Sequence, residues 1–370
     1  MKGRLASLIA AAVALFAVVG LAACGSDDKK SSSTGGGGKA EGKTIALLLP
    51  ETKTTRYEAH DRPAFEAQVK RDCPSCKVIY ANATQDPQKQ QTQAESALTD
   101  GADVLALDAV DVKSATAIVQ KANQQNVPVI AYDRLIPDAD LYAYVSFNNV
   151  RQGQIQAQTL VDKLGPSAKG KSIIMINGAP TDPSAGDYKK GAHMVLDRSG
   201  LKIAKEYDTS DWSPDKAQRE MEQAITSVGK SGFVGVYSAN DGMAGGAIAA
   251  MQAAGIKPGT IPITGGDAEV AAIQRLLTGD QFSTIYLGIK KQAQVSADLS
   301  VAAAKGGPPP PNVINAKVNN GKEDVPSVLL TPVAVTKNNI EGTVVKDGFY
   351  APKEICTGKY AQACSSAGLG

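Results

Sequence analysis

Polar and aromatic side chains recur where short apolar runs of this chain end. The runs have the length and composition of buried β-strands, and the residues after them carry paired hydrogen-bond donors and acceptors. These residues lie at 51–57, 108, 133–134, 180–182, 240–241 and 266–267. Trp212, the only tryptophan, also follows a predicted strand. Such positions can hold a ligand that is rich in hydrogen-bonding groups.

These side chains are suited to binding a sugar ring. Each sugar hydroxyl is both donor and acceptor, and a carboxylate such as Asp133 accepts from two adjacent hydroxyls. The guanidinium of Arg134 donates to two, and the amide of Asn240 can do both. The C–H faces of the ring are apolar and pack on flat aromatic rings, here Tyr57 and Trp212.

Several of these residues also have purely structural explanations. Asp133 and Arg134 could form an ion pair that caps a turn. Asp267 could be the N-cap of a helix that begins near residue 268. Trp212 could pack inside a lobe, and Asp108 could lie at the rim of a site or in a hinge.

The elements that must position these residues alternate along the chain. Strands are predicted at 44–49, 77–81, 104–107, 129–132, 144–146, 172–177, 203–207, 235–238, 263–264 and 283–286. Helical patterns include 61–71, 87–99, 112–125, 151–164, 214–228, 242–254 and 289–304. Alternation of this kind predicts βαβ units with parallel sheets, and ten strands fit two smaller sheets better than one large one. Ligands of such sheets bind beyond the carboxyl ends of the strands.

Composition limits the possible function classes. About 330 residues follow position 42, which is more than one ordinary core and favours two lobes. The chain has 39 basic and 37 acidic residues, so its charge gives no case for nucleic-acid binding. The two histidines, His60 and His193, have no partner at metal-ligand spacing. We therefore expect no metal, no cofactor and no nucleic-acid partner.

The first residues indicate export and attachment to a membrane. A short basic start precedes an apolar run over residues 5–23, and the run ends in Leu21-Ala22-Ala23-Cys24. This ending resembles the lipobox of bacterial lipoprotein precursors, which implies cleavage before Cys24 and a diacylglyceryl group on its sulfur. An ordinary secretory signal or a transmembrane anchor is the alternative. Two acyl chains would anchor the chain stably in the membrane.

Residues 25–42 read as a flexible linker. The segment GSDDKKSSSTGGGGKAEG has no bulky apolar residue, so it cannot offset the entropy of ordering. A flexible segment of about eighteen residues has a mean end-to-end distance on the order of 20–25 Å. We assign it the role of a spacer between Cys24 and the lobes.

Four further cysteines are predicted to form disulfides in an oxidising compartment. Cys73, Cys76, Cys356 and Cys364 allow three pairings, of which we favour the two local ones, Cys73 with Cys76 and Cys356 with Cys364. The Cys-x-x-Cys spacing of the first pair is also that of a redox motif. Its position at a helix-to-strand turn favours a structural bridge.

The order and spacing of several motifs resemble the xylose-binding and multiple-sugar-binding periplasmic proteins. The motifs lie at 130–136, 146–149, 238–248, 265–269, and 324–332 through 346–349. The resemblance covers the chain from Lys43 to Phe349. It implies an α/β fold of type I periplasmic-binding proteins, with two Rossmann-like lobes and a three-segment hinge. The implied first lobe is 43–149 plus 289–330 and the second is 150–288 plus 331–355, with a tail at 356–370.

The resemblance also implies a set of binding residues. Carried over by position, the ligand contacts are Arg56, Tyr57, Asp133, Arg134, Asp182, Trp212, Asn240 and Asp267, with Asp108 and Asn149 as rim or hinge residues. Two positions depart from the family pattern. Pro183 and Ser184 follow Asp182 where the family often has two asparagines, and Leu287 stands where it often has lysine. Both changes remove hydrogen-bonding groups from the expected rim.

The function implied is capture of a monosaccharide, xylose or a related pentose or hexose, and its delivery to an ABC permease. We expect a monomer, anchored to the outer face of the cell membrane through Cys24. One alternative is a sugar sensor that signals to a membrane kinase or chemoreceptor. A remote alternative is a secreted glycosidase, which would need two carboxyl groups at a defined separation, one with a raised pKa.

Overall fold

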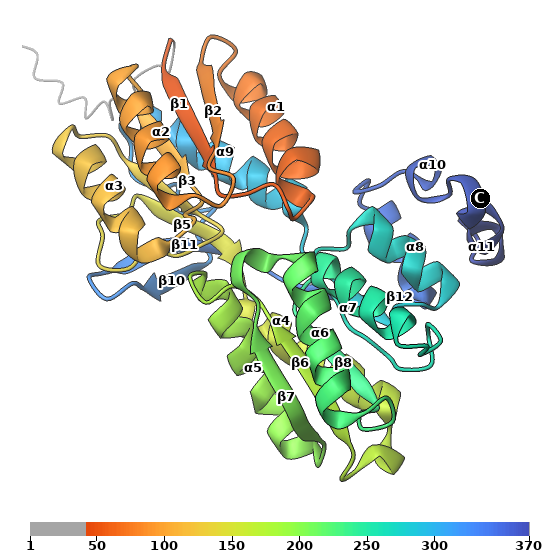
Figure 1. Ribbon diagram of the computed structural model, residues 1–370. Coiled ribbons are helices and arrows are strands. Elements are labelled where there is room, and N and C mark those ends of the chain that lie inside the picture. The colour runs from red at the N-terminus through yellow and green to blue at the C-terminus, as the bar shows by residue number, and fades with distance from the viewer. Residues whose placement is uncertain (1–41, 370) are drawn as a thin grey trace, which may run out of the picture. The chain divides into compact units, whose positions relative to one another are not determined.

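The computed structural model describes residues 42–369 (Figure 1). The predicted signal peptide, Cys24 and the linker up to residue 41 lie outside the described residues. The described part contains two lobes built around separate sheets. The first sheet has seven strands in the order β10-β11-β5-β4-β3-β1-β2, and only β10 with β11 is an antiparallel pair. These strands are β1 (Thr44–Leu49), β2 (Lys77–Asn82), β3 (Val104–Leu107), β4 (Val129–Tyr132), β5 (Ala143–Phe147), β10 (Ala316–Asn319) and β11 (Asp324–Leu330).

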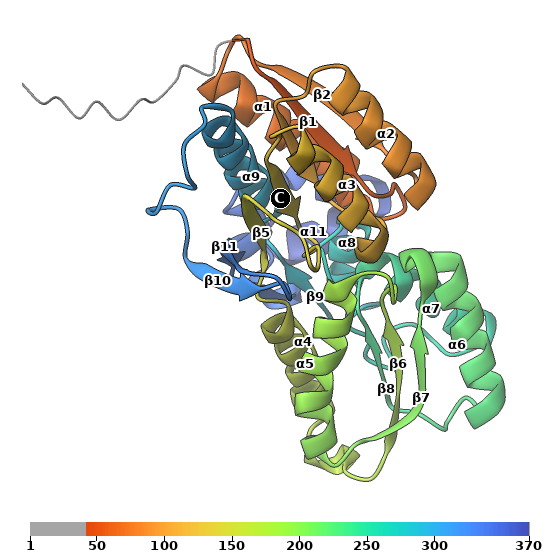
Figure 2. The same ribbon diagram turned by 90° about the vertical axis from the view of Figure 1, so that its left-hand side faces the viewer.

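Helices cover both faces of this sheet because side chains alternate along its strands. In β1, Ile45, Leu47 and Leu49 share a core with α1 (Arg62–Asp72) and α9 (Ile289–Ala304). Ala46 and Leu48 share the opposite core with α2 (Pro87–Thr99) and α3 (Val112–Gln124). Figure 2 shows α1 and α9 on one side of the sheet and α2 and α3 on the other. A continuous apolar run such as 45–49 is therefore buried on both faces, as parallel sheets require.

The second lobe is built around a three-stranded parallel sheet in the order β7-β6-β8. Its elements are β6 (Ser172–Asn177), β7 (Lys202–Asp208), β8 (Gly235–Ser238), α4 (Asn149–Leu164), α5 (Pro183–Ser199), α6 (Pro214–Val228), α7 (Asp241–Ala253) and α8 (Val270–Thr278). Helix α4 packs on α5 and α6 on α7. An antiparallel pair, β9 (Ser283–Tyr286) with β12 (Val333–Thr336), completes this lobe. The predicted strand at 263–264 is wrong as a full strand, because Ile263 forms only an isolated bridge with Val236.

Three segments cross between the lobes. They connect β5 to α4, β9 to α9, and β11 to β12. The first and third crossings are adjacent, because Leu330 pairs with Phe147 and accepts a hydrogen bond of 3.0 Å from the Asn148 N–H. The second and third are joined by the pairing of Tyr286 with Val333. The crossings therefore form one connected hinge.

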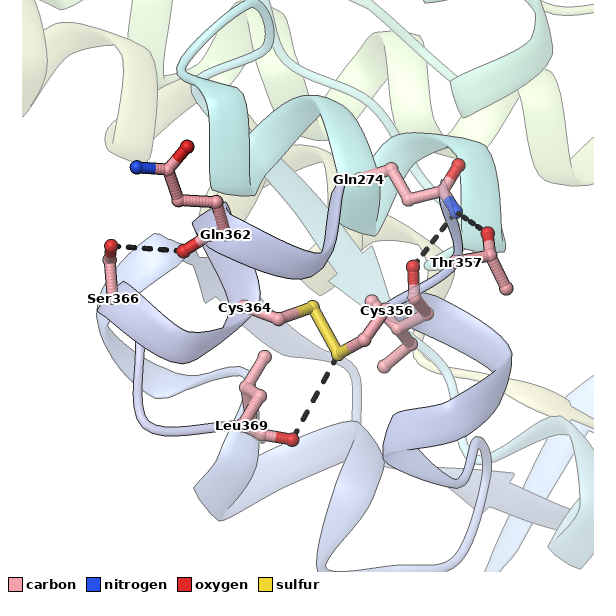
Figure 3. Close-up of a disulfide and its surroundings, with 8 residues drawn as sticks. Gln274, Cys356, Thr357, Gln362, Cys364, Ser366 and Leu369 are labelled. Atoms are coloured by element: carbon pink, nitrogen blue, oxygen red, sulfur yellow. Dashed lines mark hydrogen bonds between the residues drawn. A yellow bond between two sulfur atoms is a disulfide. The ribbon is translucent and has the colours of Figure 1, made fainter. Parts of the chain in front are cut away.

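Short helical turns and a C-terminal segment complete the chain. They are η1 (Tyr57–Asp61), η2 (Pro166–Ala168), η3 (Ser210–Trp212), η4 (Lys337–Asn339), η5 (Glu341–Val345), α10 (Pro352–Ile355), η6 (Gly358–Tyr360) and α11 (Ala361–Ser366). The structure contains both local disulfides. Cys73–Cys76 lies in the turn from α1 to β2, and Cys356–Cys364 closes the C-terminal segment (Figure 3). No helix between residues 42 and 369 is long and apolar enough to cross a membrane.

Candidate functional site

A cavity of about 30 Å³ lies between the two lobes, at the carboxyl ends of their strands. Its lining is polar and aromatic and consists of Thr54, Arg56, Tyr57, Asp133, Arg134, Asp182, Ser184, Tyr188, Trp212, Ala239, Asn240 and Asp267. All eight residues that the sequence indicates as ligand contacts lie in this lining; their contact with a ligand stays a prediction. The volume takes about two water molecules, so a sugar ring requires the lobes to move apart first.

Arg56 is the centre of a buried hydrogen-bond network in the first lobe. Its Nε and Nη2 donate to the two carboxylate oxygens of Asp61 at 3.0 and 2.8 Å. Nη1 donates to Asp133 at 3.1 Å, and Nη2 also donates to Gln292 at 2.5 Å. Gln292 in turn donates to the second oxygen of Asp133 at 2.9 Å. The guanidinium and the carboxylate of Asp133 are therefore fixed in place before any ligand arrives.

Arg134 connects the two lobes. Its Nε lies 2.9 Å from an oxygen of Asp182 in the second lobe and 3.3 Å from Asp108 in the first. Its Nη1 donates to the Ala109 carbonyl at 2.8 Å. The alternative in which Asp133 and Arg134 form an ion pair with each other is wrong, because Asp133 pairs with Arg56 and Arg134 pairs with Asp182. Both charges are thereby held at the cavity wall.

Asp182 and Trp212 form the second lobe's side of the cavity. Asp182 is the N-cap of α5 and accepts from the Ser184 N–H at 2.8 Å. Its other oxygen accepts from the indole N–H of Trp212 at 3.2 Å. Tyr188 meets the Trp212 ring edge-on, with ring centroids 6.3 Å apart. The indole is thus oriented by a hydrogen bond and by an aromatic neighbour.

Asn240 and Asp267 supply the remaining polar wall. The Asn240 Oδ1 caps α7 by accepting from the Met243 N–H at 3.0 Å. The Asp267 backbone is held by a 2.9 Å bond from its N–H to the Ile285 carbonyl. Among the described residues, no hydrogen bond engages the carboxyl group of Asp267 or the amide Nδ2 of Asn240. These groups remain able to bind a ligand.

Three residues of the cavity have left-handed backbone conformations. The φ angles are +64° at Asp133, +53° at Trp212 and +87° at Asp267. Side chains other than glycine rarely adopt this region, at a cost on the order of 1–3 kcal/mol each. The strain is borne where side chains must point into the cavity.

Burial raises the pKa of two carboxyl groups of the cavity wall. It raises the pKa of Asp182, against the opposing effect of the Arg134 charge. It also raises the pKa of Asp267 well above its ordinary value, with Arg56 opposing. A carboxyl group that keeps its proton can donate as well as accept, which suits a hydroxyl partner. Within residues 42–369, no group of three histidine, cysteine or acidic side chains is placed to hold a metal ion.

Some assignments need correction. Asp108 is wrong as a rim or hinge residue, because it is fully buried behind Arg134 and lies in none of the three crossings. Asn149 does lie at a crossing, as the first residue of α4, and donates to the Ser184 hydroxyl at 3.0 Å. Asp267 is not a helix cap, because Glu269 occupies the N-cap position of α8.

Two residues of the lining lie on a helix and follow no strand. Ser184 and Tyr188 both belong to α5, whose N-terminus points at the cavity through Asp182. Their spacing of four residues places both on one face of the helix. That spacing was the available signal for Tyr188, once Asp182 had been assigned to the site.

Two lobes with three crossings and a polar cavity between them define the type I class of periplasmic binding proteins. A family model described as "Periplasmic binding protein domain" matches residues 45–308, and the chain belongs to this family. It is similar to the D-xylose-binding periplasmic protein of Escherichia coli K12, with 34% identity over 315 residues, covering 84% of this chain and 92% of that protein.

Two further relatives extend the comparison. The multiple sugar-binding periplasmic receptor ChvE of Rhizobium radiobacter is 33% identical over 284 residues, covering 72% of this chain and 80% of that protein. A solved structure of an ABC transporter solute-binding protein from Clostridium phytofermentans with bound β-D-glucose has a TM-score of 0.76 and 25% identity. It covers 85% of this chain and all of that chain.

Proposed function

We propose that this protein captures a monosaccharide between its lobes and delivers it to an ABC-type sugar permease. The ligand is xylose or a related pentose or hexose. The observation that carries the proposal is the cavity wall, where Asp133 and Arg56 lie on one lobe, and Asp182, Trp212 and Asp267 on the other. Such a wall offers acceptors and donors to hydroxyl groups and a flat ring to a sugar's C–H face. The names of the relatives are in keeping with it.

A thermal-shift screen tests the ligand class. Ligand that binds the folded state raises the unfolding temperature by mass action. We expect one or a few pentoses or hexoses to raise it in a concentration-dependent way, and D-xylose is the first to examine. The proposal would be contradicted if none of about fifty sugars raised the unfolding temperature at concentrations far above a micromolar dissociation constant.

We further propose that Cys24 carries the lipid anchor. The support is the sequence Leu21-Ala22-Ala23-Cys24, which lies outside the described residues. A Cys24→Ser chain should appear in the medium or a soluble fraction, while the wild-type chain stays with the membrane. Equal retention of both chains would show that the lipid is not the anchor.

We propose a binding protein and not an enzyme. The Asp133 carboxylate is tied to Arg56 and Gln292, and that of Asp182 to Arg134 and Trp212. Groups engaged in this way are poorly suited to the proton transfers of glycoside hydrolysis. Release of aryl alcohol from aryl glycosides at a rate proportional to protein concentration would contradict this.

A further inference from the structure

The C-terminal segment, residues 348–369, packs on the second lobe next to the hinge. Its helices α10 and α11 lie against α8 (Figures 1 and 2). The Cys356–Cys364 disulfide closes the segment on itself, and Gln274 of α8 donates to the Ile355 carbonyl at 2.9 Å and to Thr357 at 3.3 Å (Figure 3). Ile355 and Cys364 are buried in the same core as α8. The segment is therefore a packed part of this lobe.

The residues just before α10 reach the first lobe. The Phe349 ring lies 4.1 Å, centroid to centroid, from the imidazole of His60. The Tyr350 hydroxyl lies 3.0 Å from the His60 Nε2. Lys290, in the first turn of α9, donates to the carbonyls of Gly348 and Phe349 at 2.6 and 3.1 Å. The segment thus contacts the first lobe through two elements, η1 and α9.

His60 lies in the first lobe, close in sequence to residues that form the cavity wall. It lies within η1, three residues after Tyr57 of the cavity wall and one before Asp61, the bidentate partner of Arg56. Its ring is buried, and burial together with the charges of Lys290 and Arg56 lowers its pKa to about 4, with Glu354 opposing. At neutral pH the ring is therefore uncharged, which suits stacking on Phe349.

We propose that His60, Phe349 and Tyr350 are positioning residues that hold η1 in its binding geometry, and that the disulfide-closed C-terminal segment keeps them there. None of the three touches the cavity. Their effect is to order the segment that carries Arg56, Tyr57 and Asp61, so that ligand binding does not have to supply the entropy of ordering it. The binding part of the test rests on the function proposed above.

The test compares two double variants, each of which replaces both cysteines of one disulfide with serine. Cys356→Ser/Cys364→Ser loosens the C-terminal segment. Cys73→Ser/Cys76→Ser removes a bridge at the far end of α1 and is the matched control. Hydrogen exchange is measured on peptides that cover residues 54–61, without ligand. We expect exchange there to be about tenfold faster in the first variant and near wild type in the control. Equal exchange in both variants would overturn the proposal.

Binding supplies the second arm, with D-xylose as probe and the fluorescence of Trp212, the only tryptophan, as signal. We expect His60→Ala to weaken binding about tenfold and Tyr350→Phe, which keeps the ring packing, to weaken it less. These variants also keep the test open if the disulfide variant does not fold. Unchanged affinity in His60→Ala would overturn the proposal. If the wild-type protein does not bind D-xylose, that sugar is excluded, and the exchange experiment alone decides the role of the segment.

Discussion

Trp212 lies against the backbone of Gly178 on the wall of the cavity. A Cβ atom at residue 178 would lie 2.0 Å from the indole Cη2, so only glycine leaves room for the ring there. The Asp182 carboxylate fixes the indole N–H from another side. The orientation of this aromatic platform is therefore set by residues that belong to the second lobe alone.

Replacing Trp212 tests its role as a platform. We expect Trp212→Ala to weaken sugar binding by more than about 1 kcal/mol, because the stacking surface and the partner of Asp182 are both lost. Calorimetric titration measures this, with urea unfolding of the same variant as a control for folding. An unchanged affinity would place Trp212 outside the binding contacts.

Asp241 gives a prediction about pH. It is fully buried in the second lobe, and burial with the nearby Glu269 raises its pKa to about 7, with Arg275 opposing. Because the folded state then holds this proton more tightly than the unfolded chain, its contribution to stability falls as pH rises from about 4 to about 7. Asp241→Asn should remove this contribution to the pH dependence of the free energy of unfolding, which is on the order of a few kcal/mol over that range.

Urea unfolding at pH 5, 6 and 7 measures that pH dependence in both proteins. A loss that does not vary with pH is expected in addition, because the amide NH2 replaces an accepting oxygen and then faces a donor, either Gln281 Nε2 or the Glu269 N–H. Identical pH slopes for wild type and variant would contradict the assignment.

The sequence predicts the residues on loops better than those on helices. The rule that ligands lie beyond strand ends finds Asp133 and Arg134, which follow β4, and Asp267, which follows the isolated bridge at Ile263. It misses Tyr188 on α5, and it misses Gln292 on α9, which holds Arg56 and Asp133 together. Gln292 reaches the site only through the packing of α9, which no local pattern in the sequence records, whereas the one signal for Tyr188 was its spacing from Ser184 on α5.

At the scale of elements, α4 and α5 pack closely at two glycines. A Cβ atom at Gly153 would lie 2.0 Å from the Tyr188 carbonyl, and one at Gly191 would lie 2.0 Å from the Val150 carbonyl. These are backbone atoms, so they can move only if a helix moves. The close approach therefore fixes α5 and with it Asp182, the N-cap at the cavity.

Gly153→Ala tests this contact. We expect it to lower the free energy of unfolding by about 1–3 kcal/mol, because α5 must shift to admit the methyl group. Gly186→Ala, on the partner helix α5, is the control, since nothing lies within 4 Å of its Cβ position. It should be neutral or stabilising by up to about 1 kcal/mol. Equal effects of the two substitutions would contradict the account of the packing.

The alternating apolar and amphipathic runs predict most of the elements but not the last three strands. Nine of the ten predicted strands form, because they are short β-branched runs that pair into sheets, eight of them in parallel and β9 antiparallel with β12. Strand β11 contains Pro326, which argues against a strand in any pattern reading. In the structure Pro326 is tolerated because pairing with β5 begins only at Ser327.

At the scale of the whole described body, polar contacts join the two lobes across the cleft. Arg134 meets Asp182 at 2.9 Å, the Thr55 N–H donates to Glu269 at 3.4 Å, and the exposed pair Lys53–Asp211 is separated by 3.9 Å. The exposed pair contributes little to stability because solvent screens it. The buried pair holds the lobes close around a small cavity, and a ligand must enter when the lobes are apart.

Isothermal titration of the purified chain from residue 42 onward with individual pentoses and hexoses tests the central claim most directly. We predict saturable binding of one monosaccharide per chain. Asp133→Ala should abolish or strongly weaken this binding, because the variant lacks the carboxylate that Arg56 holds at the cavity wall. The absence of binding to every pentose, hexose, sugar acid and small polyol would contradict the claim.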